Sequence, residues 1–331
     1  MARVACVMMQ RDEGVFLEPW LAWHGALFGF QNLYVLDNGS VEPAVLLALA
    51  RAAGKGVHVT YATAGRRNYA AKGECVGAVI RRLQARGAHD FFLPTDCDEF
   101  VILRTARGFS ADPAAIHAHL DTLSGARRTL RIGFQIYNNP RLVDCYVHSH
   151  NAKTFYAQGS FAWTDHGHHA DGSLAQAGFQ PTAIAHAHFH NRGFAAQQAA
   201  ARRKWSADIS LEEALARPDY AGQSHHLLAY FRLTAAEYYA GIDRQVQIHF
   251  PQLRARLAAL GAPLAWEACD PDPDLGADAA TPFLVPVTLD EELYLRANPD
   301  VAAAGLTALH HWMSFGRAEA RRLAPDEPAP P

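Results

Sequence analysis

The sequence of 331 residues has few cysteines, no long apolar run and no excess of positive charge. Its five cysteines include no Cys-x-x-Cys pair, which argues against a disulfide framework and against a zinc ribbon. No apolar stretch approaches the roughly 20 residues that span a bilayer. The apolar run at residues 4–9 is too short for the core of a signal peptide. The net charge of −3 speaks against a nucleic-acid binder. We therefore expect a cytoplasmic protein without a transmembrane segment, with peripheral association at the inner face of the membrane as a further option.

Several catalytic signatures are also missing. The sequence has no P-loop ending in Lys-Ser or Lys-Thr, no Gly-x-Gly-x-x-Gly, no His-Glu-x-x-His and no Gly-x-Ser-x-Gly. These absences weigh against P-loop phosphoryl transfer, nicotinamide redox chemistry, zincin proteolysis and α/β-hydrolase acyl transfer. What the sequence does contain is 18 histidines, with clusters at residues 166–169 and 186–190.

Strand-like and helix-like segments alternate along the first hundred residues. Short apolar runs predict strands at 4–9, 32–36, 57–61 and 91–93, and apolar spacings of three and four predict helices at 16–28, 44–53 and 74–85. This alternation predicts an α/β fold with a doubly wound, mostly parallel sheet and helices on both faces. Ligands of such sheets bind beyond the carboxyl ends of the strands. Asp12-Glu13, Asp37 and Asp96 to Asp98 follow three of the strands, so we expect three acidic spots at one edge.

The later part of the chain divides into three sections. Further strands are predicted at 129–137, 153–156 and 183–190, and helices at 113–123, 195–205 and 225–260, so that residues 1–260 form the main domain. Residues 261–287 are rich in Pro, Asp and Ala, which indicates a linker. Residues 288–331 return to a helical period and predict a small helical module with a tail.

Two clusters carry chemistry that favours a metal site. In an extended segment, residues two apart face the same way, so Asp96 and Asp98 can address one cation together. Carboxylates suit Mg²⁺ and Mn²⁺, and one imidazole from His186, His188 or His190 can complete such a site. The alternatives are a solvated acidic turn and histidines that are exposed or hydrogen-bonded.

Four segments of the chain have a familiar order and spacing. They are Phe16-Leu17-Glu18-Pro19-Trp20-Leu21-Ala22-Trp23-His24, Tyr34-Val35-Leu36-Asp37-Asn38-Gly39-Ser40, Phe92-Leu93-Pro94-Thr95-Asp96-Cys97-Asp98-Glu99-Phe100 and His188-Phe189-His190-Asn191-Arg192. Together they resemble the bacterial family-2-like glycosyltransferases, close to the group described as family 92, over about residues 3–205. The chain departs from that pattern at Asp12, where the family has Asn, at Pro19, where it has Glu, and at Gly193, where it has Ser. The resemblance implies a GT-A fold and a polysaccharide-building enzyme with an Asp-x-Asp metal motif.

The resemblance also implies roles for individual residues. Asp96 and Asp98 would hold Mn²⁺ or Mg²⁺, with His188 as the third ligand. The cation would bridge the diphosphate of a nucleotide-sugar donor, most simply a UDP-sugar, and a glycan would be the acceptor. The residues implied to contact the donor are Asp37 at the base or ribose, Glu13 at the nucleotide pocket, Asp96 beside the cation, Arg192 at the diphosphate and Lys153.

An inverting transferase needs a base about 3 Å from the acceptor hydroxyl. Asp165 is the first candidate because it lies in a polar loop, and His166 and His168 are alternatives. Glu99 is read as a support for the metal motif, and Trp163 either as a substrate contact or as a core residue.

The C-terminal residues around Asn298-Pro299-Asp300-Val301 resemble a short helical module that is appended to bacterial glycosyltransferases and surface proteins. Such a module would pack on the main domain or contact a partner. Two other functions stay open from the sequence. One is a phosphoesterase in which the two histidine clusters together bind two metal ions. The other is a non-catalytic adhesion protein.

Overall fold

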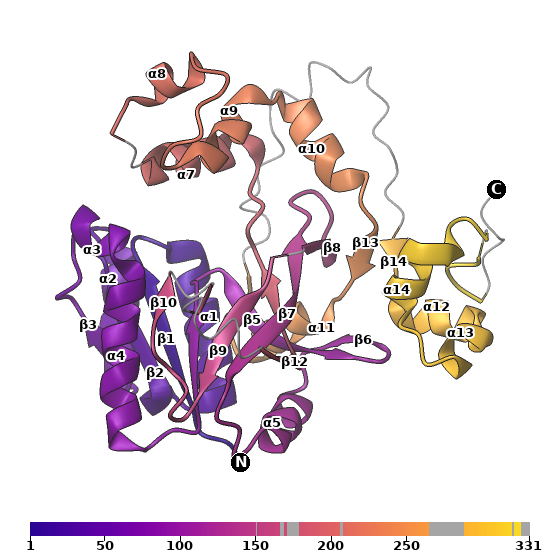
Figure 1. Cartoon of the computed structure of the whole chain (residues 1–331), viewed down its shortest axis with the longest axis horizontal. Coiled ribbons are helices and arrows are strands. Elements are labelled where there is room, and N and C mark those ends of the chain that lie inside the picture. The colour runs from indigo at the N-terminus through magenta and orange to yellow at the C-terminus, as the bar shows by residue number, and fades with distance from the viewer. Residues whose placement is uncertain are drawn as a thin grey trace.

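The computed structural model describes residues 1–149, 151–165, 169–170, 179–205, 208–264, 288–319 and 321–325. Four parallel strands form the first half of its main sheet, in the spatial order β3-β2-β1-β4 (Figure 1). They are β1 (Val4–Gln10), β2 (Leu33–Asp37), β3 (His58–Thr60) and β4 (Phe91–Thr95). Each of these strands was predicted, to within two residues at each end.

Helices cover both faces of this parallel part. They are α1 (Gly14–Phe28) and α2 (Pro43–Gly54) on one face and α4 (Lys72–Arg86) on the other. This arrangement follows from β1, whose successive side chains point to opposite faces of the sheet. Val4, Cys6 and Met8 pack in the core cluster with α1 and α2, whereas the residues between them pack in a second cluster with α4. The predicted α/β class, with a doubly wound arrangement, is therefore confirmed.

The second half of the sheet is mixed. Next to β4 lie β9 (Lys153–Ala157), β7 (Thr129–Asn138) and β8 (Cys145–Ser149), all joined antiparallel. The strand β12 (Gln180–His188) lies parallel to β7 and antiparallel to β5 (Glu99–Thr105), which continues into β6 (Gly108–Ser110). The strands β5, β6 and β8 were not predicted. A separate pair is formed by β10 (Thr164–Asp165) and β11 (His169–Ala170).

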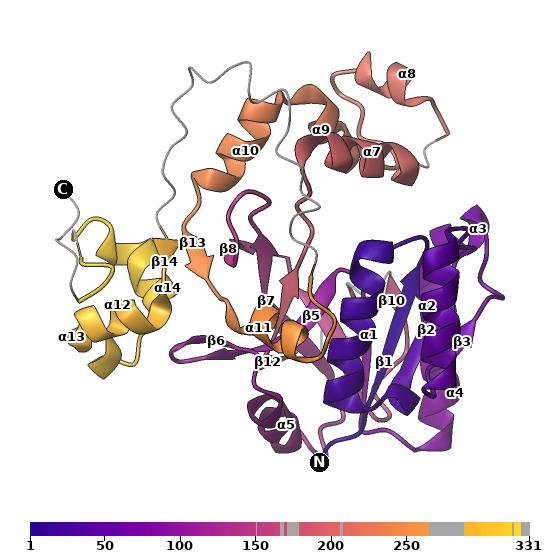
Figure 2. The ribbon, with the colours of Figure 1, turned by 180° about the vertical axis from the view of Figure 1, so that it is seen from behind.

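The remaining helices are short, apart from α7. They are α3 (Arg66–Ala70), α5 (Pro113–Thr122), α7 (Phe194–Lys204), α8 (Leu211–Leu215), α9 (Ala229–Arg232), α10 (Ala235–Asp243) and α11 (Gln252–Ala259). The expectation of one helical stretch over 225–260 is wrong, because β13 (Gln247–His249) interrupts it and pairs with β8. Helices α7 to α9 lie beyond the carboxyl ends of β1 and β2 in both views (Figure 1, Figure 2) and share a small apolar cluster around Trp205 and Leu228. Helix α10 packs instead against β8 in a separate cluster.

The C-terminal helices are joined to the main core. They are α12 (Glu291–Ala297), α13 (Pro299–Ala303) and α14 (Ala308–His311), with a π-helical turn at Trp312–Gly316. Tyr294 and Trp312 belong to the same buried cluster as Phe100, and β14 (Thr288–Leu289) adds a strand beside β13. The module therefore packs on the main domain. Most of the predicted linker, residues 265–287, lies outside the described residues, so the division into three sections stays a prediction.

None of the helices within the described ranges is both long and apolar enough to cross a bilayer.

Candidate active site

The ends of three parallel strands meet at one edge of the sheet. In the pairing register, Gln10 at the end of β1 lies opposite Asp37 at the end of β2. Thr95, the last residue of β4, lies opposite Met8 on β1. The acidic segments that follow β1, β2 and β4 therefore begin at the same edge, as the sequence predicted.

Asp37 is buried in the turn that follows β2. Its Oδ1 accepts hydrogen bonds from Gln10 Nε2 at 2.6 Å and from Ser40 Oγ at 2.5 Å. Its Oδ2 accepts from the backbone N–H groups of Gly39, at 3.1 Å, and Ser40, at 2.9 Å. Both carboxylate oxygens thus order a turn in which Gly39 has a φ of +89°, a conformation that favours glycine. Its predicted contact with a nucleotide stays a prediction.

Asp98 and His188 are brought together although ninety positions separate them in the sequence. The antiparallel register of β12 and β5 places His188 opposite Glu99. In this arrangement His188 Nε2 lies 3.3 Å from Asp98 Oδ1. Burial alone would lower the pKa of His188, but the carboxylates of Asp98 and Glu99 raise it. Burial would raise the pKa of Asp98, and the His188 imidazolium outweighs that effect and holds this pKa well below its usual value.

The other side of the His188 ring is also fixed. Its Nδ1 lies 3.1 Å from Gln135 Oε1 on β7 and 3.3 Å from Glu99 Oε1. Two acceptors at Nδ1 keep a proton on that nitrogen, which leaves Nε2 as the atom that faces Asp98.

Asp96 is held by two ammonium groups. Its Oδ1 pairs with Lys72 at the start of α4, and its Oδ2 lies 2.7 Å from Lys153 Nζ. The Lys153 side chain is 1% exposed and also lies 2.7 Å from Glu99 Oε1. Burial would raise the pKa of Glu99, but Lys153 and the two nearby histidines lower it to about 2. Desolvation would lower the pKa of Lys153, and the two carboxylates outweigh it and raise this pKa above its usual value.

The donor atoms of Asp98 and His188 fit a divalent cation. A carboxylate oxygen and an imidazole nitrogen lie side by side, and the far side of the ring is held by Gln135 and Glu99, as is usual for metal-binding histidines. Asp96 is directed to its two lysines. Within the ranges that the structure describes, no three His, Cys, Asp or Glu side chains stand together in positions that could hold a metal ion. The three-residue metal set therefore stays a prediction, with Asp98 and His188 in place for it.

Glu13 and Arg192 form an ion pair near these residues. Arg192 Nη2 lies 3.0 Å from Glu13 Oε2, and its guanidinium lies over the Phe16 ring at 5.7 Å from the ring centre. Desolvation would lower the pKa of Lys204 at the end of α7, but Asp98 and Glu13 contribute to raising it. Lys204 is thus within electrostatic reach of both Asp98 and Glu13, and the roles of Glu13 and Arg192 toward a nucleotide stay predictions.

The candidate base Asp165 lies in the separate two-stranded pair of β10 and β11. It is the last residue of β10, a strand that packs against α4, and it pairs with His169 of β11. His166 and His168 lie outside the described residues. Trp163 is 43% exposed, so its interpretation as a core residue is wrong.

Several residues of this site were not predicted. Lys72 and Gln135 are two of them, and the position of Gln135 between Phe134 and Ile136 was the only local sign that a polar side chain could be buried there. His186 is fully buried on the same face of β12 as His188, with its Nδ1 3.6 Å from Glu99 Oε2. His190 lies 3.1 Å, Nε2 to oxygen, from the Tyr230 hydroxyl. The predicted common face of the strand histidines is thus observed for His186 and His188.

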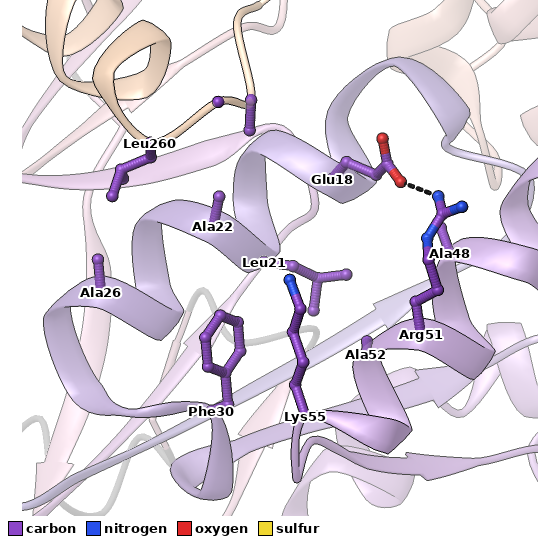
Figure 3. Close-up of a pocket in the computed structure, with 12 residues that line it drawn as sticks. Glu18, Leu21, Ala22, Ala26, Phe30, Ala48, Arg51, Ala52, Lys55 and Leu260 are labelled. Carbon is purple, nitrogen blue, oxygen red and sulfur yellow. Dashed lines mark hydrogen bonds and ion pairs between the residues drawn. The ribbon is translucent and has the colours of Figure 1, made fainter.

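A cavity of about 280 Å³ lies away from this cluster, between α1, α2 and residues 260–262 (Figure 3). Glu18 lies at its rim, paired with Arg51 of α2, and Pro19 follows it within α1. None of the predicted site residues lines this cavity. Glu18, which stands one position before the place where the family has its Glu, is therefore paired with Arg51 at this cavity.

No known protein family matches the chain, and no curated protein matches it. Solved structures do show similarity. The chain is 16% identical to glucosyl-3-phosphoglycerate synthase from Mycobacterium tuberculosis in complex with phosphoglyceric acid, over 60% of this chain and 78% of that one, with a TM-score of 0.32. It is 10% identical to S. aureus TarS, over 41% of this chain, with a TM-score of 0.24. It is 13% identical to a cytidylyltransferase from Leptospira borgpetersenii, over 48% of this chain, with a TM-score of 0.26.

The chain spans 21% of the TarS chain and 61% of the cytidylyltransferase chain. At these identities and TM-scores, the likeness assigns no activity, donor or acceptor to this chain.

Proposed function

We propose that this chain is a metal-dependent glycosyltransferase of the GT-A type. It would move a sugar from a nucleotide-sugar donor, most simply a UDP-sugar, to a hydroxyl of a glycan or other acceptor with inversion. The observation that carries the proposal is the contact of Asp98 with His188 at the carboxyl edge of the parallel sheet. Ligands of open α/β sheets bind at that edge.

In this proposal Asp98 and His188 would hold Mn²⁺ or Mg²⁺, and Asp96 would be a third ligand only if its pairs with Lys72 and Lys153 gave way. When bound, the cation would stabilise the negative charge that develops on the departing nucleoside diphosphate. Gln135 and Glu99 orient the His188 ring, so that its Nε2 faces Asp98, where the cation would bind.

The other residues bind the donor and exclude water. Arg192 would bind the diphosphate, and its ion pair with Glu13 at 3.0 Å would hold its guanidinium in position. Asp37 shapes the turn that would receive the base or ribose. Lys153 pairs with Asp96 and with the buried Glu99, and it helps to hold the pKa of Glu99 low, which preserves the negative charge of that carboxylate beside the cation site.

The acceptor hydroxyl must lose a proton as it attacks the sugar. Asp165 is our first candidate for the base that takes this proton, with His166 and His168 as alternatives. An aspartate in this role would act only when its carboxylate comes within about 3 Å of the hydroxyl.

The test is a screen of nucleotide sugars for hydrolysis without an acceptor, with Mn²⁺ present and absent. We expect one donor to be hydrolysed only with Mn²⁺, and Asp98→Asn to lower that rate by about 10² or more, as for loss of a group that stabilises charge in a transition state. The matched control is Asp219→Asn, at an exposed aspartate in the turn that follows α8, and this variant should retain the rate.

Hydrolysis that is equal with and without Mn²⁺, or equal in wild type and Asp98→Asn, would contradict the proposal. Two tightly bound metal ions with cleavage of a simple phosphomonoester would instead favour the phosphoesterase.

A further inference from the structure

Two segments of the chain carry positive charge and no acidic residue. Residues 43–73 contain Arg51, Lys55, Arg66, Arg67 and Lys72 without any Asp or Glu. Residues 172–207 contain four Arg and Lys residues, again without any Asp or Glu. Since the whole chain has 33 acidic residues, both stretches are unusual parts of it.

The structure brings the ends of these two segments together. Arg66 Nη2 at the start of α3 donates a hydrogen bond to the backbone oxygen of Trp205, directly after α7, at 3.3 Å. Tyr69 of α3 is among the groups that influence the pKa of Lys204. Both views show α7 above the end of the parallel sheet from which α3 projects (Figure 1, Figure 2). We call Arg66, Arg67, Arg203 and Lys204 the basic rim; all four are exposed.

Most of the acidic charge inside the site is already paired. Four of its acidic side chains have cationic partners among the described residues, whereas Asp37 is held by Gln10, Ser40 and backbone N–H groups. The pairs are Asp96 with Lys72 and Lys153, Glu99 with Lys153, Asp98 with His188, and Glu13 with Arg192.

Arg66, Arg67 and Arg203 of the basic rim add positive charge that these pairs do not use, and Lys204 adds charge that is shared with Asp98 and Glu13. Within the described ranges, Arg66, Arg67 and Arg203 make no ion pair, and Lys204 has no carboxylate within ion-pair distance. Arg202, by contrast, lies over the Phe231 ring at 4.8 Å from the ring centre and is occupied there. A divalent cation at Asp98 would neutralise most of the charge of a nucleoside diphosphate. The rim is therefore in excess of what the donor needs, and excess positive charge at the entrance of a site favours an anionic ligand.

We propose that the basic rim binds an anionic group of the acceptor, a carboxylate or a phosphate carried by a glycan or another polyol. This proposal rests on the proposed transferase function and adds a substrate class to it. The rim recruits the acceptor by charge and holds it between α3 and α7, beside the cation site. Binding is accordingly sensitive to salt, because exposed charges are screened over about 8 Å at physiological ionic strength.

The test measures binding of three probes by calorimetry in the presence of Mn²⁺ and UDP. Tetragalacturonate carries carboxylates, glycerol 3-phosphate carries a phosphate, and maltotetraose is neutral. We expect one anionic probe to bind and maltotetraose to bind at least tenfold more weakly. The rim variant is Arg67→Glu with Arg203→Glu, because Arg66 also joins α3 to α7. The rim variant should bind the anionic probe with an affinity about tenfold lower or more, and a tenfold change corresponds to about 1.4 kcal/mol.

The matched control is Arg86→Glu with Arg107→Glu, which makes the same change in net charge at two exposed positions, the end of α4 and the turn between β5 and β6. It should leave probe binding unchanged. Circular dichroism of both double variants shows whether they are folded.

Three results would overturn the proposal. The first is that neither anionic probe binds better than maltotetraose. The second is that the rim variant weakens the binding of Mn²⁺–UDP as much as the binding of the probe, which would assign the rim to the donor. The third is rim-dependent binding to phosphatidylserine vesicles without probe binding, which would assign it to a membrane. If wild type fails to bind Mn²⁺–UDP at all, the transferase function fails, and probe binding measured without UDP still tests the rim.

Discussion

The ion pair of Arg104 with Glu291 joins the C-terminal module to the strand that begins at Glu99. Its two bonds are 2.6 and 2.8 Å long, and the side chains are only 7% and 3% exposed. The Arg104 guanidinium also lies over the Phe109 ring, 4.7 Å from its centre. Changing Glu291 to Ala would leave this guanidinium buried without its partner. Breaking such a pair costs about 3 to 5 kcal/mol, a large part of the stability of an ordinary domain.

The assay is urea unfolding followed by tryptophan fluorescence. We expect Glu291→Ala to lose about 3 kcal/mol or more, and Arg104→Met with Glu291→Leu to recover most of that loss, because it removes both charges. The control in the same module is Asp300→Ala, which breaks the more exposed pair with Arg321 and should cost less than about 1 kcal/mol. A loss below about 1 kcal/mol for Glu291→Ala would refute our view that the module is part of the main core.

Three further predictions concern the site. Lys153→Met should destabilise the protein by several kcal/mol and abolish donor hydrolysis, since Glu99 would lose its buried ammonium partner; retained stability in urea would contradict this. Lys72→Met should tighten Mn²⁺ binding in calorimetry, because it removes one competing cation from the aspartate at the end of β4; weaker binding would assign Lys72 a supporting role. Burial lowers the pKa of His186 to about 4, so the unfolded state binds the extra proton and this residue destabilises the fold as pH falls from about 6.5 toward 4. Between pH 7.5 and 5.5, wild type should therefore lose about 1 kcal/mol more than His186→Gln, and equal losses would contradict the assignment.

Local patterns were sufficient to predict the first half of the fold. The run Val4 to Met9 and the helix period of residues 16–28 depend on neighbours along the chain, and both elements formed as expected. The strand β5 was missed because it begins inside the acidic motif, which resembles a turn when read alone. Its pairing with β12, some eighty residues later, decides its structure. The short apolar run at residues 100–103 was the local signal that could have found this strand.

In the candidate site, too, local spacing predicted some features, and others arise only from contacts between distant segments. The period of two along residues 186–188 predicted that both imidazoles share a face, and both lie near Glu99. The contact of Asp98 with His188 was expected only through the family resemblance, because nothing in the spacing of these residues joins them. The two lysines on Asp96 were not expected, since they come from α4 and β9 and meet only in the folded chain.

The most direct test of the central claim is calorimetric titration of the protein with UDP, with and without Mn²⁺, for wild type and Asp98→Asn. If Asp98 and His188 hold the cation that receives the diphosphate, wild type binds UDP only with Mn²⁺, and the variant loses that binding while remaining folded. UDP binding of equal strength without Mn²⁺, in both proteins, would contradict the metal site and the transferase function built on it.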